Sequence, residues 1–285
     1  MDAPRRVAHF AGVLGWPLEK TLSPTIHNAA FRRLGLEWVY MAWPVPPGSL
    51  AAAVGGLRAL GASGANVTMP HKEAITEHLD ELSGDGAEIG AINTIQRVDD
   101  LLVGHNTDVD GFSEFLIADV GVDVRGMNSL VLGAGGAARA VVVALYRMGA
   151  ASVTVAARRS ERAEAVAAIA RGGVGCAGEW GRLPELVRDA GMVVNATSLG
   201  AGGEDPAPGI EFRPDHLVVD LVYDPPSTPL IERARAAGAD AWSGLGMLLH
   251  QAAASFRMWT GQVAPLEEMS AAAVHALGAR GGQRG

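Results

Sequence analysis

In the first part of the chain, short apolar runs alternate with stretches whose apolar residues recur at helical spacing. This pattern predicts strands over 7–14, 38–43 and 65–70, and helices over 24–34, 50–60 and 108–118. Ser23, followed by Pro24, is expected to cap the first helix, and His71 and Lys72 are expected to open another. A hairpin is expected to join 91–96 to 101–104. Together these elements predict an α/β domain over residues 1–112.

From Leu130 onward, apolar strands alternate regularly with helices. Strands are expected over 130–132, 153–156, 192–196 and 217–222, with helices after 133 and over 161–170 and 229–237. This alternation is typical of a parallel, doubly wound sheet of the Rossmann type, which we expect over residues 113–243.

Two further helices are predicted over 246–259 and 265–277. We expect the segment 244–277 to pack back on the first domain. Residues 278–285 offer little to bury and are expected to form a mobile tail.

A glycine-rich turn follows the strand over 130–132 and opens the next helix. Gly133, Gly135 and Ala138 fit the spacing Gly-x-Gly-x-x-Gly/Ala of dinucleotide-binding folds. Such glycines let the backbone approach a pyrophosphate, and the N–H groups at the helix start face the anion. The candidate cofactor turn comprises Gly133, Ala134, Gly135, Gly136 and Ala137. A glycine turn that only opens an ordinary helix is the alternative.

Arginines stand where NAD-specific folds place an acidic residue, about 20 residues beyond the glycine turn. Arginine forms bidentate hydrogen bonds with phosphate groups. Arg158, Arg159 and Arg162 together therefore favour NADP over NAD, although each one alone is equally compatible with a solvated helix start.

Composition and charge narrow the class of protein. The net charge of −8 comes without a basic stripe, which argues against a nucleic-acid surface. Cys176 is the only cysteine, and the eight histidines show no metal-ligand spacing, so neither a disulfide nor a metal site is expected. No apolar run reaches the ~18 residues of a membrane span, and residues 1–6 lack a signal-peptide core. We therefore expect a soluble cytoplasmic protein that binds neither nucleic acid nor membrane.

Polar side chains gather at the predicted strand ends and turns. They are Thr21, Ser23, Asn66, Thr68, Lys72, Asn93, Thr94, Asn106, Thr107, Asp108, Asn195, Thr197, Ser198, Asp220, Tyr223 and Gln251. In open α/β sheets ligands bind beyond the carboxyl ends of the strands, so these groups are candidates for lining one crevice. A set of hydroxyls and amides suits a small polyhydroxylated substrate.

Lys72 and Asp108 are the candidates for proton transfer. A carbonyl that is reduced by hydride needs a proton as the alkoxide forms, and a partly desolvated lysine can supply it. An aspartate beside it would hold the ammonium group in place. The alternatives are a surface lysine and a helix-capping aspartate. A helix N-terminus disfavours a cation, so a lysine at a predicted helix start favours a function.

Seven sequence blocks resemble, in order and across nearly the whole chain, the motifs of shikimate dehydrogenases and the related quinate/shikimate enzymes. The blocks are 15–27, 66–72, 90–94, 104–111, 133–137, 195–200 and 244–251. Their combination is far more specific than any single motif.

The resemblance implies reversible, NADP-dependent reduction of 3-dehydroshikimate to shikimate, with Lys72 and Asp108 as the catalytic pair. It implies that the substrate is held by Thr21, Ser23, Thr68, Asn93, Tyr223 and Gln251. It implies that the cofactor lies on Gly133–Ala137, Arg158, Arg159, Arg162 and Thr197, with Leu221, Gly244 and Met247 near the nicotinamide. Residues 1–112 would then be the substrate-binding and catalytic domain and residues 113–243 the NADP-binding domain. The oligomeric state stays open, with a homodimer as one arrangement.

Two departures from the family pattern bear on specificity. Thr21 stands where the family usually has serine, and its extra methyl group reshapes the carboxylate pocket. The family's Asn-Arg-Thr at the 2′-phosphate reads Ala157-Arg158-Arg159. A quinate or aminoshikimate-type dehydrogenase on the same scaffold is therefore the nearest alternative. A non-catalytic nucleotide-binding sensor is a further alternative, against which the Lys72 and Asp108 pair argues.

Overall fold

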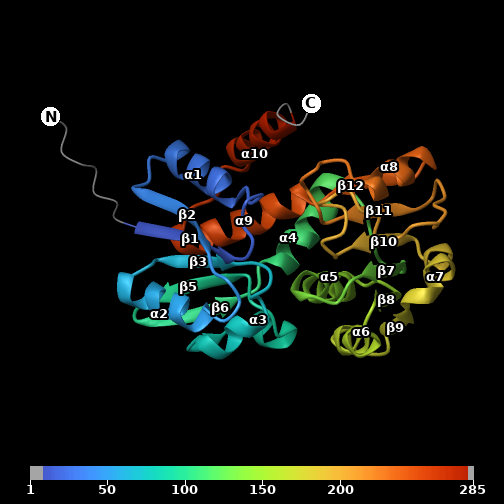
Figure 1. Ribbon diagram of the computed structural model, residues 1–285, viewed down its shortest axis with the longest axis horizontal. Helices are drawn as coiled ribbons and strands as arrows, with labels where there is room; N and C mark the ends of the chain where they lie inside the picture. The colour runs from blue at the N-terminus through green and yellow to red at the C-terminus, as the bar shows by residue number, and fades with distance from the viewer. Residues whose placement is uncertain (1–8, 282–285) are drawn as a thin grey trace. The chain divides into compact units, whose positions relative to one another are not determined.

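The computed structural model describes residues 9–281, which divide into two compact units (Figure 1). The first unit contains the described residues up to Thr107 and from Gln251 onward, and the second runs from Asp108 to His250. The chain thus passes between units after residues 107 and 250, whereas the sequence predicted boundaries after 112 and 243.

The first unit is built on a mixed six-stranded sheet. Its strands are β1 (His9–Gly15), β2 (Trp38–Pro44), β3 (Gly64–Val67), β4 (Glu81–Leu82), β5 (Thr94–Val98) and β6 (Leu101–His105), in the order β2-β1-β3-β5-β6-β4. Strands β2, β1 and β3 are parallel, while β5 runs antiparallel to both β3 and β6. The predicted hairpin is confirmed, with its turn at Asp99, which has a φ of 52°.

Four short helices accompany this sheet. They are α1 (Ser23–Arg33), α2 (Leu50–Leu60), the 3₁₀ helix η1 (Ala74–His78) and α3 (Gly84–Ile89). Leu22, not Ser23, occupies the N-cap of α1, and no side chain caps this helix. The prediction that Ser23 caps the helix is therefore wrong, since the helix already includes Ser23.

The segment before η1 also differs from the prediction. Lys72 lies in a turn rather than at a helix start, and η1 begins only at Ala74. The Lys72 carbonyl accepts a hydrogen bond from Ile92 N at 2.7 Å, and the buried His71 ring nitrogen Nε2 lies 2.7 Å from the Val45 carbonyl. Contacts to other segments therefore help to hold this stretch, beside the local hydrogen bond from Ile75 N to the His71 carbonyl at 2.9 Å.

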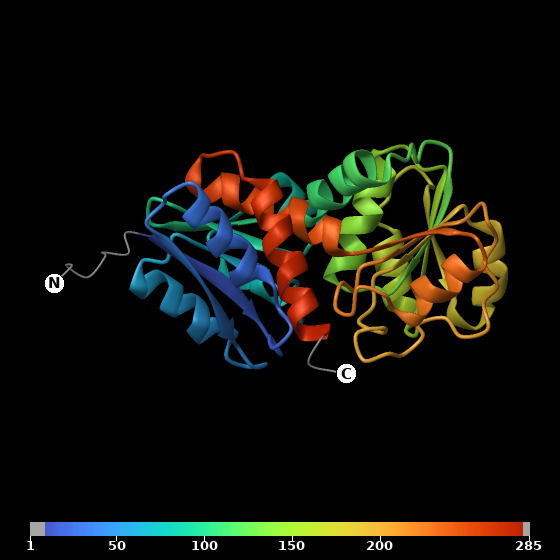
Figure 2. The same cartoon turned by 90° about the horizontal axis from the view of Figure 1, so that it is seen from above.

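The C-terminal helices pack on the first unit, as predicted. Helix α10 (Leu266–Gly281) lies beside α1 (Figure 2), and the part of α9 (Leu245–Thr260) from Gln251 onward contacts the sheet. Trp259 Nε1 donates to the Ile95 carbonyl at 2.9 Å, and Gln96 Nε2 donates to the Met258 carbonyl at 2.9 Å. Helix α10 continues to Gly281, so the predicted end at residue 277 was too early, and Arg280 Nη1 donates to the Lys20 carbonyl at 2.8 Å. Residues 282–285 of the expected tail lie outside the described residues.

The second unit is built on a parallel six-stranded sheet. Its strands are β7 (Asn128–Leu132), β8 (Ser152–Ala157), β9 (Gly175–Glu179), β10 (Met192–Asn195), β11 (Leu217–Asp220) and β12 (Asp240–Ser243), in the order β12-β11-β10-β7-β8-β9. Every pair in this sheet is parallel, and the strand order reverses between β7 and β10. The predicted doubly wound fold is confirmed.

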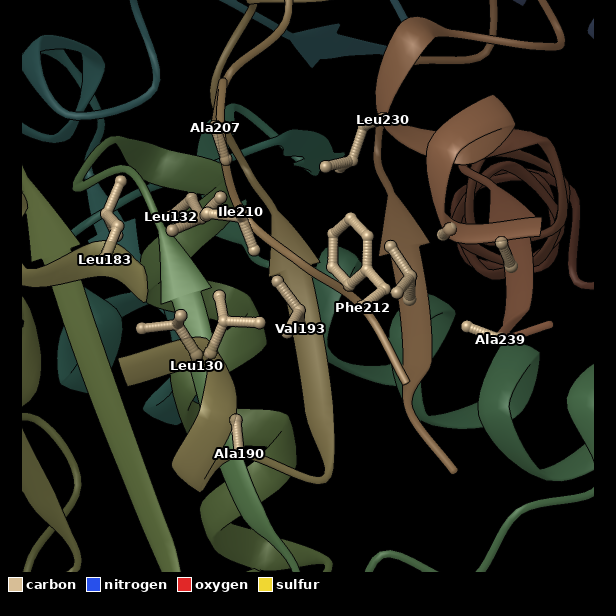
Figure 3. Close-up of a cluster of buried hydrophobic side chains, with 14 of the residues drawn as sticks. Leu130, Leu132, Leu183, Ala190, Val193, Ala207, Ile210, Phe212, Leu230 and Ala239 are labelled. Carbon is tan, nitrogen blue, oxygen red and sulfur yellow. The ribbon is translucent and has the colours of Figure 1, made fainter. Parts of the chain in front are cut away.

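Helices cover both faces of this sheet. They are α4 (Asp108–Glu114), the π-helix η2 (Phe115–Val120), α5 (Gly136–Arg147), α6 (Ser160–Ala167), the 3₁₀ helix η3 (Trp180–Arg182), α7 (Leu183–Asp189), α8 (Pro229–Ala236) and the start of α9. On one face, Leu130 of β7 and Val193 of β10 meet Phe212 of the loop before β11 (Figure 3). Leu183 of α7 and Leu230 of α8 close this apolar layer. None of the helices described is long and apolar enough to span a bilayer.

An aromatic cluster in the first unit surrounds the buried ring of His27. This ring stacks on Tyr40 with the centroids 4.3 Å apart, and Trp259 and Phe256 lie at 5.3 and 6.5 Å. Within residues 9–281, neither ring nitrogen of His27 has a hydrogen-bond partner. Burial lowers the pKa of His27 from 6.5 to about 3, because the charged ring would lose its hydration.

The pKa of His27 predicts a loss of stability on acidification. Between pH 6.5 and about 3, this imidazole binds a proton in the unfolded chain but not in the folded one, so the free energy of unfolding falls as the pH falls. The contribution reaches ~1.4 kcal/mol per pH unit. His27→Phe should remove this part of the slope in urea unfolding, measured beside His275→Phe, which removes a ring at the surface. A His27→Phe slope equal to that of the wild type would contradict the assignment.

Candidate functional site

The glycine turn of the second unit lies at the point where the strand order reverses. Gly133 directly follows β7 and has a φ of 106°, a backbone conformation that residues other than glycine rarely adopt. A Cβ at Gly133 would lie 3.0 Å from Thr197 Cγ2 and 3.1 Å from the Ala196 carbonyl. The turn after β7 and the loop after β10 are therefore in contact, which is where doubly wound folds bind their ligands.

The N-terminus of α5 is open toward this turn. Gly135 is the N-cap residue, and no side chain caps the helix. A Cβ built on Gly135 would meet no atom of the described chain within 4 Å, whereas Ala138, one turn on, is fully buried. This 12-residue helix therefore has an uncapped N-terminus whose backbone N–H groups a ligand can reach. Such a site is suited to an anionic group.

The three predicted arginines follow β8, the strand next to β7. Arg158 comes directly after this strand, Arg159 is the N-cap residue of α6, and Arg162 lies in its first turn. All three are exposed, and within residues 9–281 neither Arg158 nor Arg159 has an ion-pair partner. Gly133 N donates to the Ala156 carbonyl at 2.8 Å, which ties the end of β8 to the glycine turn. The unit thus places cations and an open helix N-terminus along one edge of the sheet.

Residues predicted to lie near the nicotinamide are also neighbours within the second unit. A Cβ at Gly244 would lie 2.2 Å from the Leu221 carbonyl, so only glycine fits there, and Gly244 N donates to the Val222 carbonyl at 3.3 Å. Tyr223 is half-buried beyond β11, and Met247 is buried in the first turn of α9. The structure therefore groups Leu221 with Gly244 at the carboxyl end of β11.

In the first unit, the predicted hydroxyl pair is in mutual contact. Thr21 Oγ1 lies 3.3 Å from Ser23 Oγ, to which it donates, and it accepts from Ser23 N at 3.3 Å. The Ser23 side chain also hydrogen bonds to the hydroxyl of Tyr40, whose pKa burial raises well above its usual value. Because Ser23 does not cap α1, its hydroxyl is available to this pair.

Asn93 and Gln251 meet although 158 residues separate them. Asn93 Nδ2 donates to Gln251 Oε1 at 3.3 Å and to Thr107 Oγ1 at 2.9 Å. Asn93 Oδ1 accepts from Thr107 N at 2.7 Å, which fixes the residue directly before Asp108. All of these side chains are buried.

Sequence reasoning missed two members of this polar cluster, Tyr40 and Ser255. The Tyr40 hydroxyl donates to Asn66 Oδ1 at 2.7 Å, and Asn66 Nδ2 donates to Ser255 Oγ at 3.0 Å. Ser255 Oγ also lies 3.2 Å from Thr107 Oγ1 and donates to the Gln251 carbonyl at 3.1 Å. Ser255 stands four residues after Gln251 on α9, a spacing that places both on one helix face and that a helical projection of the sequence displays.

Thr68 and Lys72 flank a turn after β3. A Cβ at Gly15 would lie 2.3 Å from Thr68 Cγ2, so Thr68 packs directly on the backbone at the end of β1. Lys72 is half-buried, and its carbonyl accepts a hydrogen bond from the backbone N–H of Ile92, the neighbour of Asn93.

Asp108 is buried at the first position of α4, where the second unit begins. Within the described chain, no group of three or more histidines, cysteines and acidic residues is arranged to hold a metal.

A doubly wound sheet with an open glycine turn at its switch point defines a dinucleotide-binding α/β protein. Three family models match the chain. The shikimate dehydrogenase substrate binding domain matches residues 13–95, the shikimate / quinate 5-dehydrogenase model 117–201, and the shikimate 5′-dehydrogenase C-terminal domain 244–274.

Relatives match over nearly their whole length. The chain is 46% identical to a shikimate dehydrogenase (NADP(+)) of Moorella thermoacetica, covering 96% of the chain and 95% of the relative. It is 44% identical to one of Methanopyrus kandleri, covering 94% and 96%. A Thermus thermophilus shikimate 5-dehydrogenase, solved in complex with NADP(H) and shikimate, superimposes with a TM-score of 0.84 at 39% identity, covering 94% of this chain and all of that one. The chain belongs to the shikimate dehydrogenase family, which confirms the predicted family and fold class.

Proposed function

We propose that the protein catalyses the reversible, NADP-dependent reduction of 3-dehydroshikimate to shikimate. The observation that carries this proposal is the conjunction of an open, glycine-lined helix N-terminus with Arg158 and Arg159, which have no ion-pair partner among residues 9–281, in a chain of this family. The same activity and cofactor appear in the names of relatives 44–46% identical to it. A nucleotide sensor without turnover would have no need of Lys72 as a proton donor.

NADP(H) fits the residues present in the second unit. The pyrophosphate would lie against the backbone of Gly133–Ala137 at the α5 N-terminus, beside Thr197. Arg158, Arg159 and Arg162 would neutralise the 2′-phosphate, and Leu221, Gly244 and Met247 would line the nicotinamide pocket. When bound, NADPH supplies the hydride that reduces the substrate carbonyl carbon.

The substrate would be held by the hydroxyls and amides of the predicted set. Thr21 and Ser23 present two hydroxyls for its carboxylate. Thr68, Asn93, Tyr223 and Gln251 would hold its ring hydroxyls. The contact between Asn93 and Gln251 orients both carboxamides before the substrate arrives, which reduces the entropy lost on binding.

Lys72 would donate the proton that converts the developing alkoxide into the product hydroxyl, and Asp108 would stabilise its ammonium form. Composition supports a specific need for lysine here, because Lys20 and Lys72 are the only lysines beside 21 arginines. Arginine cannot give up its proton at neutral pH, so a chain that otherwise uses arginine keeps a lysine where a proton must be transferred.

Initial rates with shikimate or quinate, each with NADP⁺ or NAD⁺, test the proposed function. Fast turnover is expected only with shikimate and NADP⁺. A higher kcat/KM for quinate would assign the chain to the alternative branch and identify Thr21 as the residue to examine. Absence of turnover in all four mixtures, with NADPH still bound, would favour the nucleotide sensor.

Loss of the proton donor should slow the chemical step. Lys72→Ala should lower kcat by about two to four orders of magnitude with little change in the KM for shikimate. Lys72→Arg keeps the charge but not the transferable proton, so it should be nearly as slow. Lys20→Ala, at the only other lysine, is the control and should retain full activity. A Lys72→Arg variant with near-normal kcat would restrict Lys72 to an electrostatic role.

The arginine cluster should determine which cofactor is preferred. Arg158→Ala should raise the KM for NADP⁺ by roughly tenfold to a hundredfold, because a hydrogen bond to a charged group is lost, while the KM for NAD⁺ changes little. Arg188→Ala removes an exposed arginine of α7 in the same unit and is the control. Equal losses with both cofactors would rule out a role of Arg158 at the 2′-phosphate.

A further inference from the structure

The second unit contains a buried carboxylate that the proposed mechanism does not use. Asp220 is the last residue of β11, and its side chain is fully buried. It pairs in register with Asn195, the last residue of β10. Among residues 9–281, Asp220 has no ion-pair partner, and burial raises the pKa of its carboxyl group despite three hydrogen bonds that oppose the shift.

The two carboxylate oxygens of Asp220 together accept hydrogen bonds from three parts of the chain. Oδ1 accepts from Asn195 Nδ2 at 2.8 Å and from Val222 N at 3.0 Å. Oδ2 accepts from Thr228 Oγ1 at 2.6 Å, and Thr228 in turn caps α8 by accepting from Ile231 N at 3.3 Å. One side chain therefore joins the loop after β10, the loop after β11 and the start of α8.

The contact with Asn195 determines how the loop after β10 is held. With Nδ2 directed to Asp220 and to the Leu199 carbonyl, Asn195 Oδ1 is left to accept from Thr197 N at 3.1 Å and Thr197 Oγ1 at 2.7 Å. Thr197 is the residue whose Cγ2 packs on Gly133. Asp220 thus orients the Asn195 amide, and that amide orients Thr197 over the glycine turn.

The contact with Val222 holds the loop after β11. Val222 N donates to Asp220 Oδ1, and the Val222 carbonyl accepts from Gly244 N. Leu221 N, next to Val222, donates to the Asn195 carbonyl at 2.9 Å. Leu221 and Gly244 are the residues proposed to line the nicotinamide pocket. A single carboxylate therefore reaches both the pyrophosphate side and the nicotinamide side of the proposed cofactor site.

We propose that Asp220 is a positioning residue for the cofactor site, acting through Asn195 on Thr197 and through Val222 on Leu221 and Gly244. This inference rests on the proposed function only in taking NADPH as the ligand. The arrangement costs free energy, because a desolvated carboxylate without a cation is less favourable than an apolar side chain packed in its place. The geometry of the two loops is what the carboxylate maintains.

NADPH binding, measured by fluorescence titration, tests the proposal without requiring turnover. Asp220→Ala should raise the Kd for NADPH by about tenfold or more, because Asn195 and Val222 lose their shared acceptor. Asp220→Asn retains an oxygen for those two donors and should recover most of the affinity. Asn195→Ala interrupts only the branch through Thr197, so it should weaken NADPH binding measurably but no more than Asp220→Ala. The double variant should bind no more weakly than Asp220→Ala alone, because Asp220→Ala already interrupts the branch through Asn195.

Val218→Ala is the matched control for stability. It removes methyl groups from a fully buried residue of the same strand, so it should lower the melting temperature while leaving the Kd for NADPH within about twofold of the wild type. NADPH binding by folded Asp220→Ala as tight as that of the wild type would overturn the proposal. An equal loss of affinity in Val218→Ala would reduce Asp220 to a structural role and overturn it too.

If Asp220→Ala fails to fold, the test rests on Asn195→Ala, and an unchanged Kd for NADPH in that variant would overturn the proposal.

NADPH binding and turnover by the wild-type protein distinguish this proposal from the proposed function. Wild-type protein that binds NADPH without reducing 3-dehydroshikimate would refute the function alone. Wild-type protein that does not bind NADPH would overturn both.

Discussion

The parallel pairing of β7 with β10 is the interaction on which the second unit depends. Ala196 N extends this ladder by one hydrogen bond to the Leu132 carbonyl, at 2.8 Å, and brings the two loops into contact. Gly133 can turn there because it tolerates a φ of 106°, and the absent Cβ leaves room for Thr197. The open α5 N-terminus, the arginines after β8 and the Asp220 contacts all take their positions from this junction.

The first unit relies on a different kind of interaction. Its polar cluster consists of hydroxyls and amides in which almost every group both donates and accepts, as Asn66 does between Tyr40 and Ser255. Such a network is stable when buried only if its members are satisfied, and it then holds each side chain in one orientation. The proposed substrate ligands Ser23, Asn93 and Gln251 hydrogen bond to its members, so the network orients them as well.

Local patterns predicted the elements that sequence alone can specify. Helix α2 was predicted with its exact bounds, and the glycine turn between β7 and α5 was predicted from the spacing of small residues. Strand β9, Gly-Cys-Ala-Gly-Glu, was missed because it lacks β-branched residues and is defined by its pairing with β8. Strand β12 and helices α3 and α7 were missed because each is short and stabilised mainly by neighbouring elements. The turn at Lys72 was predicted as a helix start because its contacts with distant Ile92 leave no local signal.

The candidate site divides in the same way. Residues at strand ends, such as Thr68 and Asn195, follow from the rule that ligands bind at the carboxyl edge of the sheet. Tyr40 and Ser255 could not be ranked from sequence, because their importance arises from contacts with Asn66, 26 and 189 residues away. Hydrogen bonds between residues so far apart in the chain leave no periodic pattern in the sequence.

The division of the chain has a consequence for the order in which the protein is made. The second unit is continuous from Asp108 to His250, whereas the first is assembled from the two ends of the chain. During synthesis from the N-terminus, the whole second unit emerges before Ser255 and Trp259 exist, so it can fold while the first unit still lacks part of its interior. The polar cluster around Asn66 is thus among the last features to close. The sheet of the first unit has all its strands by then, but the surface that α9 covers must stay soluble until that helix is synthesised.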